Sequence, residues 1–264
     1  MDIWNIPVFM TTGLISGFLA GLFGIGGGII LVPIFWIIFS QIGIPESEAI
    51  KLSVGTSLSV ITVTTLFTSG THLLKGNLNL KEVGWLLIWI LGGVGTGIYF
   101  FHLLPGKLLK KLFALLLIIT SIKHLKKNNR KTSLSLASEK IIIPITVFLS
   151  ALFSSLLGIG GGVIINSSLF SLTNREVTKI VALSSIVSLL NALFGSIGYL
   201  LIKPEIQVSY QAGYIYVPAT IFVSVGALVG SKIGLNVLYR VESANLKKWF
   251  ALLLIFIATK ILVS

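Results

Sequence analysis

The sequence of 264 residues contains no cysteine, which excludes disulfide bonds, thiolate metal sites and cysteine-based relays. Histidine is nearly as scarce. The three histidines, His72, His102 and His124, lie near the ends of separate apolar segments, so the sequence predicts no buried metal cluster. We therefore expect neither a bound metal nor a cofactor.

Acidic residues are also scarce. The chain has eight Asp and Glu residues against 20 Lys and Arg, and each acidic residue lies at a segment end or in a loop. Carriers of cations or protons commonly keep a carboxylate within the membrane, where an ionisable group is costly and is retained for function. This absence argues against a metal-cation carrier and against a proton relay built from carboxylates.

Catalytic signatures are missing as well. The chain has no Gly-Lys-Ser/Thr phosphate loop, so it does not hydrolyse ATP, and it has no paired carboxylates or nucleophile–base pair that would suggest a membrane enzyme. The net charge is +12, but the cations cluster in short loops between apolar runs. That pattern is typical of contact with lipid headgroups and not of nucleic-acid binding. We predict a non-enzymatic protein that contacts lipids and no nucleic acid.

Apolar residues dominate what is present. They make up 55% of the chain, and charged residues only 11%, whereas a soluble domain carries about 25%. About 20 helical residues cross the ~30 Å hydrocarbon core of a bilayer. The apolar segments are 7–39, 49–74, 83–103, 108–123, 141–173, 177–202, 211–238 and 246–263. The sequence therefore predicts an all-α polytopic membrane protein, multi-pass in the cell membrane.

Two glycine pentads interrupt the longest of these segments. Gly24-Ile25-Gly26-Gly27-Gly28 lies inside segment 7–39, and Gly158-Ile159-Gly160-Gly161-Gly162 lies inside segment 141–173. Each glycine in a helix costs about 1 kcal/mol relative to alanine, so clustered glycines mark a place where the helix unwinds or turns. By contrast, the spacing Gly226-x3-Gly230 is typical of close helix packing.

The pentads belong to a wider internal repeat. The run 109–118 returns as 246–255, and Thr56-Ser57 corresponds to Ser184-Ser185. We therefore divide the chain into a first transmembrane repeat, 1–125, a basic polar linker, 126–140, and a second transmembrane repeat, 141–264.

The broken segments can either cross the membrane or turn back as hairpins. Crossing gives parallel repeats and divides Lys and Arg evenly between the two faces. Hairpins give inverted repeats and gather most of these cations on one face, together with the linker 126–140. Because positive charge is enriched in cytoplasmic loops, the second arrangement is favoured, with the linker in the cytoplasm and both termini outside.

The glycine motifs resemble those of the sulfite exporter TauE/SafE family, over nearly the whole chain. The fuller match runs from Gly21 to Pro33 and continues at Gly55-Thr56-Ser57-Leu58. In the second half, Asn166-Ser167 replaces Val32-Pro33, and Leu183-Ser184-Ser185 replaces Gly55-Thr56-Ser57. The resemblance implies a duplicated helical transporter of anionic sulfur compounds, such as sulfite or organosulfonates.

The glycine pentads by themselves also indicate an anionic substrate. A half-helix that begins after each pentad offers unpaired backbone N–H groups and about half a positive charge, and glycine lets a ligand approach closely. We expect the pentads to face each other across a central site. The predicted substrate-binding residues are Gly24, Gly26, Gly27, Gly28, Thr56, Ser57, Gly158, Gly160, Gly161, Gly162, Asn166, Ser184 and Ser185. Further candidate donors are Ser53, Ser188 and Asn191.

The leading hypothesis is a secondary transporter that exports a small sulfur-containing anion. A transporter or channel for another small organic anion is the first alternative, and a non-transporting membrane scaffold subunit is the second. The sequence leaves open the identity of the anion, the coupling ion, the direction of flux and whether the protein forms a homo-oligomer.

Overall fold

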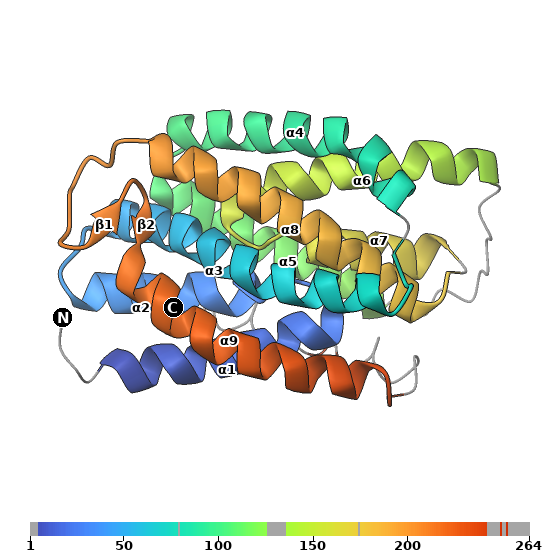
Figure 1. Cartoon of the computed structure of the whole chain (residues 1–264). Helices are drawn as coiled ribbons and strands as arrows, with labels where there is room; N and C mark the ends of the chain where they lie inside the picture. The colour runs from blue at the N-terminus through green and yellow to red at the C-terminus, as the bar shows by residue number, and fades with distance from the viewer. Residues whose placement is uncertain are drawn as a thin grey trace.

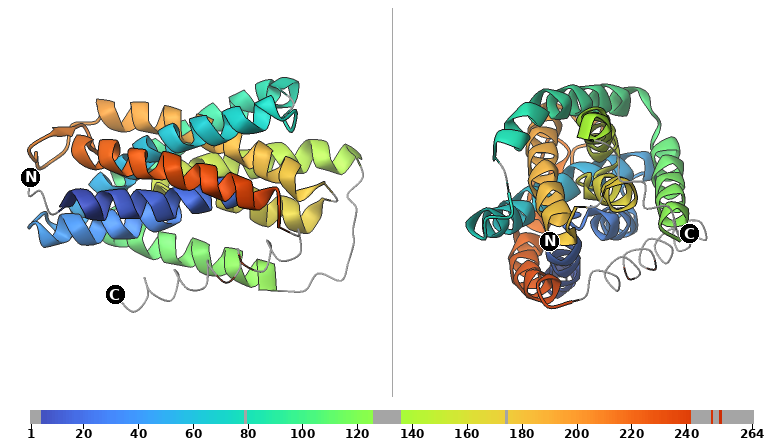
Figure 2. Two further views of the ribbon diagram at one scale, coloured as in Figure 1. Left: turned by 60° about the horizontal axis from the view of Figure 1, so that its bottom comes forward. Right: turned by 90° about the vertical axis from the view of Figure 1, so that its right-hand side faces the viewer.

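The computed structural model describes residues 5–78, 80–125, 136–173 and 175–241, together with Trp249 and Leu252. The elements are α1 (Asn5–Phe23), α2 (Gly28–Gln41), α3 (Glu46–Leu74), α4 (Leu80–Leu103), α5 (Gly106–Leu125), α6 (Leu136–Leu157), α7 (Gly162–Leu172), α8 (Val177–Leu201), β1 (Gln211–Ala212), β2 (Ile215–Tyr216) and α9 (Val217–Leu238). The helices lie roughly along one direction and form a single bundle (Figures 1 and 2).

Within the described ranges, six helices are long and apolar enough to cross a membrane: α1, α3, α4, α6, α8 and α9. The shorter α2 is also apolar. This confirms the prediction of an all-α polytopic membrane protein. Helix α6 begins at Leu136, so the end of the predicted linker is helical. Residues 126–135 and most of the predicted segment 246–263 lie outside the described residues.

The first glycine pentad turns the chain back on itself. The ring centroids of Phe9 in α1 and Phe35 in α2 are 6.5 Å apart. A continuous helix would separate these residues by about 39 Å at 1.5 Å per residue. Helices α1 and α2 therefore form a hairpin, and Figure 1 shows α2 running back toward the end of the bundle where α1 begins.

The second pentad makes a similar turn from the other end. Ser150 Oγ in α6 donates a hydrogen bond of 2.9 Å to the carbonyl oxygen of Gly161, although a straight helix would place these residues about 16 Å apart. In Figure 1, α6 starts at the end of the bundle opposite to the start of α1. The two hairpins thus enter the bundle from opposite ends. The internal duplication itself stays a prediction.

The tips of the two hairpins meet inside the bundle. A Cβ atom added to Gly28 would clash with the carbonyl oxygen of Gly158, and one added to Gly162 would clash with that of Gly24. Ile61, close to the middle of α3, would contact Cβ atoms at turns from both hairpins. Both turns are therefore buried near mid-height of the longest helix.

Helix α9 packs against α1 through glycines on both helices. The glycines Gly13, Gly17 and Gly21 of α1 meet the α9 backbone, and Gly226, Gly230 and Gly234 of α9 meet the α1 backbone. Any side chain at these positions would collide with the partner helix. The close-packing role predicted for Gly226 and Gly230 is confirmed.

The predicted apolar segment 211–238 is not one helix. It starts with a short antiparallel hairpin in which Gln211 pairs with Tyr216, and α9 begins only at Val217. Gly213, with a φ angle of 54°, lies in the turn between the two strands, and Tyr210, with a φ angle of 64°, directly precedes β1. Pro218 then lies in the first turn of α9, where its missing N–H costs no helical hydrogen bond.

Candidate functional site

The two glycine turns have nearly the same backbone conformation. In the first, Gly24, Gly26 and Gly27 have φ angles of 65°, 73° and 84°. In the second, the corresponding glycines at 158, 160 and 161 have φ angles of 72°, 75° and 84°. These left-handed values favour glycine because a Cβ atom would crowd the backbone. Each turn ends in a helix, α2 or α7, whose N-cap is a glycine without a capping side chain.

Each turn leaves a row of backbone N–H groups without a partner. The first bonds of α2 are donated by Ile30 and Leu31 to Gly27, and those of α7 by Ile164 and Ile165 to Gly161. Among the residues that the structure describes, none accepts a hydrogen bond from the N–H groups of 25–29 or 159–163.

These residues are all buried. Buried N–H groups are rarely left unpaired, and a helix N-terminus adds a partial positive charge. The two adjacent turns therefore form a buried concentration of hydrogen-bond donors.

The carbonyl groups of Gly24 and Gly158, at the start of each turn, and of Phe23 before the first turn accept hydrogen bonds from side chains across the bundle. Ser57 Oγ of α3 donates to Gly158 at 2.8 Å, and Ser184 Oγ of α8 donates to Gly24 at 3.1 Å. The side-chain amide of Asn166 donates to the carbonyl oxygen of Phe23. These bonds cross the bundle and fix each turn with its N–H side unoccupied by protein acceptors.

Two predicted site residues make other contacts. Thr56 Oγ1 accepts a hydrogen bond of 2.9 Å from the backbone N–H of Tyr216, and so connects α3 to the β-hairpin. Ser185 Oγ accepts one from Thr68 at 3.4 Å. The sequence repeat pairs Ser57 with Ser185, but the residue that repeats the role of Ser57 is Ser184. None of these contacts tests substrate binding, so the predicted binding role of these side chains stays a prediction.

The site also contains groups outside the predicted substrate-binding residues, among them Asn191, which the sequence offered only as a further candidate donor. Asn191 is fully buried, donates to Ser150 at 3.4 Å, and its Oδ1 has no hydrogen-bond partner within the described ranges. Its amide lies against Gly161. Ser150 precedes Gly161 by the same interval by which Ser16 precedes Gly27, and both serines contact their turns. Comparing the residues that precede the two turns by this interval would have identified Ser16 and Ser150 from the sequence.

Comparison with known proteins places the chain among membrane transporters. The family model described as "Sulfite exporter TauE/SafE" matches residues 9–261, a range that includes both glycine turns. A protein named as a probable membrane transporter from Methanocaldococcus jannaschii is 31% identical over 250 residues, which cover 92% of this chain and 90% of that protein.

A second relative, also named a probable membrane transporter protein, comes from Haemophilus influenzae. It is 30% identical over 261 residues, and the match covers 96% of both chains. The probable membrane transporter protein YjnA of Bacillus subtilis is 26% identical over 214 residues, covering 72% of this chain and 80% of that protein. No solved structure matches the chain.

Proposed function

The chain belongs to the sulfite exporter TauE/SafE family, and from this membership we propose that it exports a small sulfur-containing anion, such as sulfite or an organosulfonate. The coarser statement is established: the protein is a multi-pass membrane transporter and not an enzyme. The proposal concerns the identity of the substrate, the residues that bind it and the direction of transport.

The observation that carries the proposal is the set of buried, unpaired N–H groups at residues 25–29 and 159–163. A sulfite or sulfonate group presents three oxygen atoms, each of which accepts hydrogen bonds. A hydrogen bond to a charged group is worth about 1.5–3 kcal/mol, roughly twice a neutral one. Such an anion satisfies donors that otherwise remain unpaired, and it benefits from the positive ends of α2 and α7.

In this proposal the hydroxyl and amide groups have two roles. Ser57, Ser184 and Asn166 engage three carbonyl oxygens, those of Gly158, Gly24 and Phe23, and so keep these acceptors away from the anion. Asn191 Nδ2 lies beside Gly161 and donates one hydrogen bond to Ser150, so its second N–H is the group that would donate to the anion. The protein thereby presents donors to the substrate and keeps these three carbonyl oxygens engaged elsewhere.

The membrane potential supplies a driving force for export. Moving one elementary charge through 100 mV is worth about 2.3 kcal/mol, and the inside-negative potential drives an anion outward. An anion exporter therefore needs no coupling ion. This matches the absence of acidic residues from the middle of the apolar segments.

The test is flux in proteoliposomes. Vesicles with purified protein are loaded with sulfite or with methanesulfonate, and efflux is followed with an imposed potential, against protein-free vesicles and against vesicles loaded with a cation. Saturable, potential-dependent efflux of either anion supports the proposal. Flux of acetate or lactate alone would instead support the transport of another organic anion, and sealed vesicles with folded protein that pass no anion would contradict transport at this site.

A further inference from the structure

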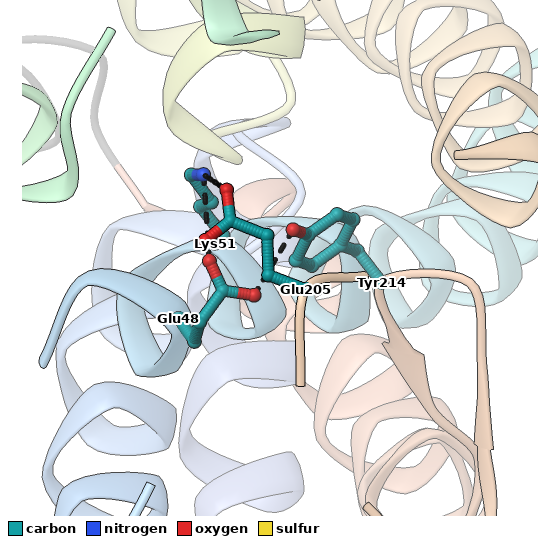
Figure 3. A network of polar contacts seen from close by, with 4 residues as sticks. All are labelled: Glu48, Lys51, Glu205 and Tyr214. Atoms are coloured by element: carbon teal, nitrogen blue, oxygen red, sulfur yellow. Dashed lines mark hydrogen bonds and ion pairs between the residues drawn. The ribbon is translucent and has the colours of Figure 1, made fainter. Parts of the chain in front are cut away.

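A cluster of charged and phenolic groups lies outside the glycine turns, at the end of the bundle where α3 begins. Lys51 Nζ lies 3.4 Å from Glu48 Oε1 and 3.6 Å from Glu205 Oε1 (Figure 3). The Lys51 side chain is only 12% exposed. A lysine that anchored the helix to lipid headgroups would extend into the interface, so the buried position of Lys51 needs another explanation.

The two carboxylates that pair with Lys51 differ in how firmly they are held. Glu48 lies on the same helix, its side chain is 5% exposed, and its Oε2 accepts a hydrogen bond of 3.0 Å from the Tyr214 hydroxyl (Figure 3). Burial and the nearby Glu48 raise the pKa of Tyr214, so this phenol stays protonated and donates. Glu205, in contrast, is 76% exposed and comes from the connection between α8 and β1.

We propose that Lys51 is a binding site for a small oxyanion at this mouth of the transporter, which the predicted topology places outside and through which an exported anion leaves, and that the Glu205 carboxylate occupies it in the closed conformation. Glu205 presents the same chemistry to Lys51 as the substrate does, namely a negatively charged oxygen. When a monovalent anion replaces Glu205, the charge around Lys51 and Glu48 is unchanged. The inference rests on the proposed function, because it assumes that an anion crosses this mouth.

The position of Lys51 connects this mouth with the glycine turns. Val54 lies one helical turn further along α3 and contacts Gly158 of the second turn. The backbone of Tyr214 covers Gly55, which also lies one turn from Lys51. The connection that carries Glu205 and Tyr214 therefore covers the strip of α3 between Lys51 and the second turn, and its release exposes Lys51 together with that strip.

Lys179 provides a matched control. It lies near the start of α8, as Lys51 lies near the start of α3, and it pairs with Glu176 three residues earlier at 3.4 Å. Its side chain, however, is 58% exposed and that of Glu176 is 70% exposed. Such an exposed pair contributes little and is not shielded from solvent.

The experiment measures the dissociation constant of sulfite and of methanesulfonate by titration calorimetry, on purified full-length protein in detergent. We expect Lys51→Gln to raise the dissociation constant about tenfold, since it removes a charge-assisted contact. Glu205→Gln should lower it about fivefold, because an internal competitor no longer reduces the fraction of free sites. Lys179→Gln should leave it unchanged.

The double variant Lys51→Gln/Glu205→Gln distinguishes the proposal from a general electrostatic effect, in which removing any negative charge at this mouth strengthens anion binding. If Glu205 acts through Lys51, its removal brings no gain in affinity in the Lys51→Gln background. A gain that persists there, or a Glu205→Gln protein that binds no more tightly than wild type, overturns the Lys51 site. A gain of affinity cannot come from misfolding, so the Glu205→Gln result stands by itself. The double variant is compared with Lys51→Gln after thermal unfolding in detergent has shown that both are folded.

The same measurement separates this inference from the proposed function. A wild-type protein that binds sulfite, with all variants equal to it, contradicts the Lys51 site and leaves the proposed function standing. A wild-type protein that binds neither anion contradicts both.

Discussion

Gly27 is one of the three glycines of positive φ on which the shape of the first turn depends. Its φ angle is 84°, and a Cβ atom there would lie 2.7 Å from the carbonyl oxygen of Ser16. The left-handed conformation alone costs a non-glycine residue about 1–2 kcal/mol, and the contact with a rigid backbone atom adds to this cost.

We therefore predict that Gly27→Ala destabilises the protein by at least about 2 kcal/mol and abolishes anion flux. The control is Gly95→Ala, since a Cβ atom at this α4 glycine meets no other atom within 4 Å. That substitution should slightly stabilise α4, by up to about 1 kcal/mol, without changing flux. Thermal unfolding in detergent and flux in proteoliposomes measure both effects. Normal flux through Gly27→Ala would contradict a binding role for the turn.

Ser57 allows a second test at the residue scale. Its hydroxyl is the side-chain donor to the buried carbonyl of Gly158, so Ser57→Ala leaves that carbonyl without this bond. We expect a loss of about 1–3 kcal/mol in the free energy of unfolding. Ser53→Ala on the same helix is the control, because its hydroxyl donates only to Ala49 one turn earlier. Equal losses for the two variants would mean that the bond to Gly158 contributes nothing.

At the scale of elements, α9 is held to α3 at both ends by tyrosines. At its start, Tyr214 donates to Glu48 and the N–H of Tyr216 donates to Thr56. At its end, the hydroxyl of Tyr239 lies 2.9 Å from His72 Nδ1, at the far end of α3.

The contacts around Tyr239 involve two further side chains. Asn77 donates to the Tyr239 hydroxyl at 3.2 Å, and Lys75 Nζ lies 3.4 Å from the centre of the ring. Burial raises the pKa of Tyr239, so its phenol is neutral at physiological pH. The two ends of α3 are thus fastened by separate sets of contacts, which one substitution at a time can loosen.

We predict that Tyr214→Phe and Tyr239→Phe open opposite mouths. The native chain has no cysteine, so a single introduced cysteine reports solvent access at its own position. Ser53→Cys reports access from the start of α3 and Ser69→Cys from its end, and both positions are buried. Losing a hydrogen bond worth about 1 kcal/mol should raise thiol labelling about fivefold. Tyr239→Phe should act on Ser69→Cys and not on Ser53→Cys, and Tyr214→Phe should do the reverse. A parallel rise at both positions would indicate general loosening instead.

The sequence predicted the elements better than their contacts. Apolar run length predicted the spans, and clustered glycines predicted both breaks, because each signal is local. The hairpin before α9 was missed since Tyr214, Ile215 and Tyr216 are as apolar as a helix would be, and their partners are distant: Tyr199 for the N–H of Tyr214 and Thr56 for that of Tyr216.

The candidate site shows the same limit. Because Ser57 and Ser184 lie in the segments that follow the pentads, the sequence correctly predicted that they lie beside the turns. It did not predict which carbonyl groups accept their hydrogen bonds. Ser57 reaches a carbonyl 101 positions away, and Ser184 one 160 positions away. The sequence comparison of the repeats pairs Ser57 with Ser185, next to the serine that makes the equivalent bond, Ser184. Glu48 looked like an ordinary helix-end carboxylate, and only the fold reveals its burial.

At the scale of the whole molecule, the arrangement of charge decides what drives transport. The two hairpins enter from opposite ends and meet at their glycine turns (Figure 1). In the part of the chain that the structure describes, Glu48 is the buried carboxylate, and it lies near the start of α3, one helical turn or more from the residues that contact the turns. The centre thus offers N–H donors but no acidic group that would exchange a proton with each substrate.

We therefore predict electrogenic transport. Methanesulfonate is the suitable probe, since it carries one negative charge at every pH used. At an imposed potential of 100 mV, the equilibrium distribution across the vesicle should reach about fiftyfold, which corresponds to ~2.3 kcal/mol per charge. A pH gradient alone should produce no accumulation. Accumulation that follows the pH gradient and ignores the potential would mean electroneutral proton coupling, and would direct attention to Glu48 as the group that carries the proton.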